Sequence, residues 1–130
     1  MEKILKVGLQ ASKEYVVSTS DSASAYGSGD VEVYSTPALI ALMEGTSKDC
    51  VASCLNEEES TVGIEVNIRH LKATPIGMKV NCHSELVEIK GKRLIFSVTA
   101  YDEAGKIGEG IHIRYIINKE EFINKAYKKI

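Results

Sequence analysis

The sequence lacks the features that would direct it to a membrane or to a nucleic acid. Its longest apolar run, residues 37–43, is far too short to span a bilayer, and the first ten residues lack the long apolar core of a signal peptide. A net charge of −2 gives no electrostatic reason to expect a nucleic acid as a partner. We therefore expect a cytoplasmic protein with no membrane segment and no nucleic-acid partner.

Cysteine is also scarce. Cys50, Cys54 and Cys82 cannot all pair with one another, and without a secretory segment they are expected to be thiols in a reducing compartment. Together with His83 they could be imagined as metal ligands, but no CxxC or HExxH spacing supports such a site. Neither the GxSxG motif of a serine hydrolase nor a glycine loop that opens a helix is present. The sequence thus predicts no metal.

A chain of 130 residues with 44% hydrophobic and 26% charged residues is typical of one globular domain, here residues 1–130. Only residues 33–55 have the apolar period of a long helix, with Thr36 expected at the N-cap and Pro37 at the first helical position. The apolar side chains of this helix cover almost every direction around its axis, which predicts burial nearly all round. Glu44 lies within this apolar shell, so it either has a functional role or points at solvent.

From residue 61 the apolar period changes to two, which is typical of a half-buried strand. The residues expected on one face are Val62, Ile64, Val66 and Ile68. His70 shares their parity and is therefore expected to point towards the helix. It is either a core histidine with satisfied hydrogen bonds or a functional residue.

Three more strand patterns follow, at residues 78–89 with a bulge near Val87, at 92–101 and at 107–118. The last of them sets Ile111, Ile113, Tyr115 and Ile117 on one face and His112 and Arg114 on the other. A first strand at residues 6–17, a polar loop or lid at 18–30 and a short C-terminal helix capped by Asn118 complete the chain. This order predicts an α+β class, with an antiparallel sheet wrapped around one long central helix.

Three candidate functional side chains remain: Thr36 at the start of the helix, Glu44 two turns later and His70 on the following strand. A hydroxyl, a carboxylate and an imidazole can together position or activate a nucleophile for acyl transfer. Thr36 and Glu44 are eight residues apart, which is about 12 Å along a regular helix and too far for direct contact. Either the chain bends back at Thr36, or a second subunit completes the site.

Three motifs resemble the hotdog-fold thioesterases, and most closely the fluoroacetyl-CoA thioesterase family, over the chain from Val7 to Phe122. The motifs are STPALIALMEGTSKDC, VNIRHLKATPIG and GEGIHIRYII. The resemblance implies a hotdog fold and hydrolysis of a small or medium acyl-CoA by a homodimer or a higher homo-oligomer, with no cofactor beyond the CoA of the substrate. Catalytic roles are implied for Thr36, Glu44 and His70.

The same resemblance implies substrate-binding roles for two more residues. Gly63 matches a glycine at the thioester carbonyl, and Arg114 matches an arginine of the last strand, where a structural salt bridge at the dimer contact is the alternative. The family's fluoroacetyl-specific member has a lid with phenylalanines, whereas the corresponding positions here are Gly27 and Asp30. Two other functions stay open, a hotdog dehydratase or hydratase and a non-catalytic acyl-CoA-binding domain.

Overall fold

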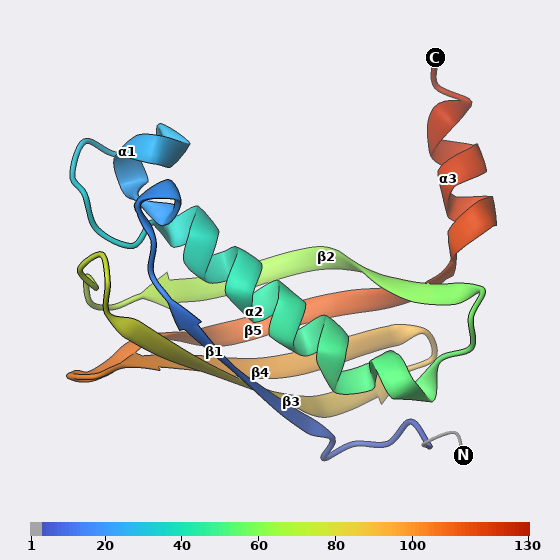
Figure 1. The fold of residues 1–130 in the computed structure, drawn as a ribbon. Helices are drawn as coiled ribbons and strands as arrows, with labels where there is room; N and C mark the ends of the chain where they lie inside the picture. Colours follow the sequence, from blue (N-terminus) through green and yellow to red (C-terminus); the bar gives the residue numbers. More distant parts are fainter. Residues whose placement is uncertain (1–3) are drawn as a thin grey trace.

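Figure 1 shows the computed structural model, which describes residues 4–130, as one curved sheet with a long helix lying across it. The sheet is antiparallel throughout, with strand order β1-β3-β4-β5-β2. Its strands are β1 (Gln10–Val16), β2 (Glu59–His70), β3 (Lys79–Lys90), β4 (Arg93–Asp102) and β5 (Gly105–Asn118). The helices are α1 (Ala23–Tyr26), α2 (Thr36–Val51) and α3 (Lys119–Tyr127), with single 3₁₀ turns η1 (Thr19–Asp21) and η2 (Ala52–Cys54). The predicted α+β architecture is confirmed.

The start of α2 differs by one residue from the prediction. Ser35, not Thr36, is the N-cap, and its side chain accepts a hydrogen bond from the backbone N–H of Ala38 at 3.2 Å. Thr36 is the first helical residue and Pro37 follows it within the first turn. Because the cap is satisfied by Ser35, the hydroxyl of Thr36 is available for another partner.

The core lies between α2 and the sheet. Leu39, Met43 and Val51 of the helix are at most 1% exposed and pack against fully buried residues of β3 and β4: Val80, Cys82, Leu86, Leu94, Phe96, Val98 and Ala100. The prediction that α2 is buried nearly all round is wrong, because Pro37, Ala41 and Lys48 line an exposed side of the helix. The apolar residues of α2 are concentrated towards the sheet, and small or charged residues face away from it.

A β-bulge in β2 reverses which residues face the helix. The register with β5 shifts between Gly63 and Glu65, so that Gly63 lies opposite Arg114 while His70 lies opposite Gly108. Residues directly opposite in an antiparallel ladder share a face. The predicted common face of Val62, Ile64, Val66 and Ile68 is therefore wrong before the bulge and right after it, where His70 points to the helix side. The bulge predicted in β3 is confirmed, between Leu86 and Glu88.

The last strand presents polar residues to the helix. Ile111 and Tyr115 are 38% and 39% exposed, whereas His112 and Arg114 are 1% and 6% exposed. Arg114 does lie opposite the apolar set, as the alternation predicts, but this side of β5 is the buried one. The side chains that approach α2 from β5 thus include a histidine and an arginine.

The predicted loop or lid and the predicted C-terminal helix both occur in the structure, whereas the first strand, predicted at residues 6–17, is limited to Gln10–Val16. The predicted loop or lid at residues 18–30 contains η1 and α1, and Gly27 ends α1 in the left-handed conformation with a φ of 68°. The side chain of Asn118 caps α3 by accepting from the backbone N–H of Glu121. Figure 1 shows α3 standing away from the sheet. None of the helices in the described residues is long and apolar enough to cross a membrane.

Candidate active site

Thr36 and His70 meet where the first turn of α2 passes the end of β2. Thr36 Oγ1 lies 2.7 Å from His70 Nδ1, which is a short hydrogen bond between side chains 34 positions apart in the sequence. His70 lies after the bulge, in the regular part of the ladder opposite Gly108, on the face of β2 that is turned towards this helix. Both residues line a cavity of about 220 Å³ whose other walls include Val33, Leu71 and Lys72.

Burial lowers the pKa of His70 below its ordinary value of 6.5, and the backbone of Lys72 acts more weakly in the opposite direction. The ring is therefore neutral at pH 7, so one of its two nitrogens is unprotonated and can accept a proton. His70 Nε2 is buried and has no partner within hydrogen-bond distance among residues 4–130. His70 is thus not a core histidine with both nitrogens satisfied. Its Nδ1 is hydrogen-bonded to the hydroxyl of Thr36.

Glu44 lies apart from this pair, next to Arg114. Glu44 Oε2 is 3.9 Å from Arg114 Nη1, with side-chain exposures of 40% and 7%. The guanidinium is held in place by β2, since Nε donates to Thr61 Oγ1 at 2.7 Å and Nη2 donates to the Thr61 carbonyl at 2.9 Å. Burial lowers the pKa of Arg114 and the Glu44 carboxylate raises it, but an arginine keeps its charge in either case. Glu44 therefore faces a fixed positive charge.

Gly63 lies at the closest approach of β2 to these two side chains. A Cβ atom built at Gly63 would lie 2.8 Å from Glu44 Oε2, 3.1 Å from His112 Cε1 and 3.4 Å from Arg114 Nη1. A side chain at this position would displace the Glu44 carboxylate, whereas the guanidinium is at ordinary contact distance. The backbone of the bulged segment is consequently in contact with the Glu44–Arg114 pair.

His112 belongs to the same group and was not identified from the sequence as a site residue. Its Nδ1 lies 2.9 Å from the carbonyl oxygen of Glu65, and its Nε2 lies 3.1 Å from Arg114 Nη1. The alternation of β5 could have pointed to it, because His112 and Arg114 share a face. The sequence did not show that this face of β5 is buried.

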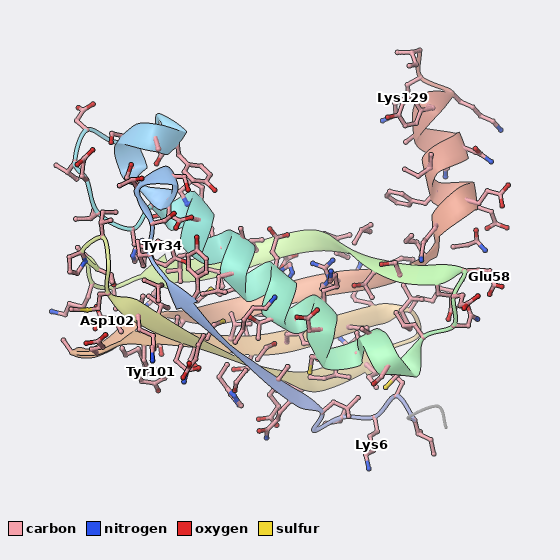
Figure 2. All side chains as sticks on the ribbon, viewed as in Figure 1. Lys6, Tyr34, Glu58, Tyr101, Asp102 and Lys129 are labelled. Atoms are coloured by element: carbon pink, nitrogen blue, oxygen red, sulfur yellow. The ribbon has the colours of Figure 1, made fainter. Side chains whose placement is uncertain are left out.

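The described chain therefore holds two groups of candidate residues rather than one triad. Thr36 is part of the regular helix and does not bend back, so Glu44 lies about 12 Å further along the axis. Tyr34, labelled in Figure 2, marks the end of α2 that carries the Thr36–His70 pair, and Glu58 marks the opposite end of the sheet, where β2 begins. We refer below to Thr36 with His70 as the histidine group, and to Glu44 with Gly63 and Arg114 as the glutamate group.

Among residues 4–130, no cluster of three or more histidine, cysteine or acidic side chains could hold a metal ion. Cys50 and Cys82 are buried thiols, and Cys50 Sγ donates to the carbonyl of Leu9 at 3.1 Å. Burial raises the pKa of both thiols. They behave as small core residues.

Comparison with known proteins identifies similar enzymes. A family model described as fluoroacetyl-CoA-specific thioesterase matches residues 17–120. The fluoroacetyl-CoA thioesterase of Streptantibioticus cattleyicolor is 35% identical over 98 residues, which is 75% of this chain and 70% of that protein. A solved structure of a fluoroacetyl-CoA thioesterase superposes with a TM-score of 0.92 at 29% identity, covering 98% of this chain and 99% of that one. A hot-dog-like protein from Thermanaerovibrio acidaminovorans, at 21% identity, covers 97% and 93% of the two chains with a TM-score of 0.88, which shows the shared fold.

Proposed function

Because the chain belongs to the fluoroacetyl-CoA-specific thioesterase family, we propose that this acyl-CoA thioesterase hydrolyses a small acyl-CoA to the free acid and CoA through Thr36, Glu44 and His70. The 2.7 Å bond between Thr36 and a neutral His70 at a cavity is the observation that carries the proposal. Complexes of the similar enzyme's variants with acetyl-CoA, and with fluoroacetate and CoA, have been solved.

In the proposed reaction, water or the Thr36 hydroxyl attacks the thioester carbonyl while a basic group of the site takes its proton. His70 Nδ1 is placed to accept the proton of Thr36, and Glu44 is the other candidate base. Negative charge develops on the carbonyl oxygen, where the Gly63 N–H and the charge of Arg114 stabilise it. The C–S bond then breaks, and the CoA thiolate receives a proton. If Thr36 attacks first, water hydrolyses the resulting ester.

The part of the proposed site that the histidine group lines favours a short acyl group. The cavity at Thr36 and His70 has a volume of about 220 Å³, which is below the range of about 300–1,000 Å³ usual for drug-sized ligands. The lid positions Gly27 and Asp30 are exposed and supply no aromatic side chain. A short acyl group is therefore the proposed substrate, and because these two lid positions lack phenylalanines, no particular preference for fluoroacetyl follows.

The separation of the two groups is resolved if the enzyme is a homodimer paired through β2, which is an edge strand of the sheet. A symmetric antiparallel pair centred on Asn67 sets Glu65 opposite Arg69 of the partner subunit, which is a favourable pair of opposite charges. Beyond the bulge it sets Gly63 opposite His70 of the partner subunit. Exposed apolar side chains on β2, with Ile64 at 47% and Val66 at 42%, also support such an interface.

In this dimer the histidine group of one subunit and the glutamate group of the other form one active site. Two equivalent sites result from the two-fold symmetry. The reaction as proposed needs no cofactor beyond the CoA of the substrate and no metal, and the proposed location is the cytoplasm.

A thiol-release assay over short, branched, aromatic and long acyl-CoAs tests this function. We expect release of CoA thiol with short acyl groups, and a loss on the order of 10²-fold or more in His70→Ala and Glu44→Ala. Release of thiol at the wild-type rate by both variants would place the activity elsewhere. Hydration of an enoyl-CoA without thiol release would identify a hydratase, and tight binding without turnover would identify a binding domain.

A further inference from the structure

His112 is a buried titratable residue that the proposed reaction does not use. It is 1% exposed and both of its ring nitrogens have partners. One partner is the carbonyl of Glu65, the residue at which the register of β2 resumes after the bulge. The other is Arg114, which faces Glu44. The ring thus connects the bulge in β2 to the guanidinium.

These contacts determine which nitrogen carries the proton. Arg114 Nη1 is only a donor, so His112 Nε2 at 3.1 Å must accept from it. The Glu65 carbonyl is only an acceptor, so Nδ1 at 2.9 Å must donate to it. In a doubly protonated ring, Nε2 would also carry a hydrogen, and this N–H would face the N–H of Arg114 Nη1 with no acceptor between them. Burial, the largest effect, lowers the pKa of His112, and Arg114 adds to this, although the Glu65 carbonyl and Glu44 oppose it.

We propose that His112 is a positioning residue for hydrolysis: as the neutral Nδ1–H tautomer it holds Arg114 against Glu44 and fixes the bulged segment that carries Gly63. This inference rests on the function proposed above, because it assigns His112 to the glutamate group of that site. His112 Cε1 would lie 3.1 Å from a Cβ atom at Gly63, so the ring also limits how far this backbone can move. His112 itself does not reach the substrate. It acts through Arg114 and Gly63.

Two variants of similar shape, His112→Asn and His112→Gln, each keep one of the two hydrogen bonds of His112 and remove the other. Asparagine at position 112 places its amide near the position of Nδ1, where it can donate to Glu65 but cannot reach Arg114. Glutamine places its side-chain oxygen near the position of Nε2, where it can accept from Arg114. We expect kcat to fall on the order of 10-fold in His112→Asn with KM nearly unchanged, and to recover to within about 3-fold of wild type in His112→Gln.

His83→Asn is the matched control, because His83 on β3 bonds to Ser12 through Nδ1 and lies outside both groups of the site. It should keep the wild-type kcat. Equal kcat in wild type and a folded His112→Asn would overturn the proposal, as would equal losses in the two His112 variants.

The tautomer can be measured without any variant or substrate. Two-bond ¹H–¹⁵N correlation spectra of the wild-type protein at neutral pH should show His112 protonated at Nδ1 only. Protonation at Nε2, alone or with Nδ1, would overturn the inference even if a variant failed to fold. Failure of the proposed function is distinguishable, because wild-type protein would then release no thiol from any acyl-CoA, whereas failure of this inference alone leaves wild-type turnover intact.

Discussion

A heterodimer built from two inactive variants tests whether the active site contains residues of both subunits. In the proposed dimer, each site takes its histidine group from one subunit and its glutamate group from the other. His70→Ala and Glu44→Ala each remove one group, so each homodimer should lose activity on the order of 10²-fold or more. A heterodimer of the two variants places both defects in one site and leaves the other site intact.

The size of the recovery follows from this geometry. Thr36 and Glu44 lie about 12 Å apart along α2, so the proposed site takes one of the two groups from each chain. With one intact site out of two, the heterodimer should show about half of the wild-type kcat per dimer. A site contained within one subunit would instead give two defective sites and no recovery.

The assay uses co-expression with two affinity tags, isolation of the doubly tagged heterodimer, and thiol release with a short acyl-CoA. Pairing His70→Ala with Thr36→Ala is the matched control. Both substitutions lie in the histidine group, so neither site of that heterodimer is intact and no recovery above the Thr36→Ala homodimer is expected. A His70→Ala and Glu44→Ala heterodimer no more active than its parents, or a fully active monomer in sedimentation experiments, would refute the composite site.

Three further predictions concern single positions and pH. Gly63→Ala should lower kcat on the order of 10-fold or more with little change in melting temperature, because its Cβ atom would lie 2.8 Å from Glu44 Oε2; an unchanged kcat would contradict the close approach. Gly110→Ala should cost about 3 kcal/mol or more in urea unfolding, since its Cβ atom would lie 2.1 Å from a backbone oxygen of β2; a stable variant would show that β2 can move. His70 and His112 have lower pKa values in the folded protein than in the unfolded chain, so the unfolded chain binds more protons as the pH falls. The free energy of unfolding should therefore decrease from about pH 7 to pH 5. The decrease should be smaller in His112→Gln.

Much of the fold could be predicted from the sequence because local pattern and tertiary structure agree. One segment with a helical period and several with a period of two gave the central helix and four of the five strands nearly at their observed bounds. The side chain of Asn118 marked the start of α3, and the inward direction of His70 was also correct. Each of these features depends on side chains within one element.

The features that were missed depend on contacts between elements. The bulge at Ile64 is one extra residue with no distinctive sequence signal, yet it exchanges the faces of β2 for every residue before it. Ser35 and Thr36 are both good N-cap residues, so the sequence alone could not decide which of them caps the helix. Alternation in β5 separated His112 and Arg114 from the isoleucines correctly, but the usual preference for apolar burial favoured the wrong side as the buried one.

The buried polar side of β5 is costly for folding, and that cost supports a functional explanation. Removing a charged guanidinium from water is unfavourable unless its donors are bonded and a negative charge lies close by. Arg114 has partners for all three nitrogens, but Glu44, at 3.9 Å and 40% exposed, is the only carboxylate within ion-pair distance among the described residues. The positive charge is therefore incompletely compensated within one chain, and it lies beside Gly63, where the proposed reaction develops negative charge. In the proposed reaction, Arg114 would interact more strongly with the negative charge of the transition state than with the uncharged carbonyl of the substrate, which is the condition for it to increase the rate.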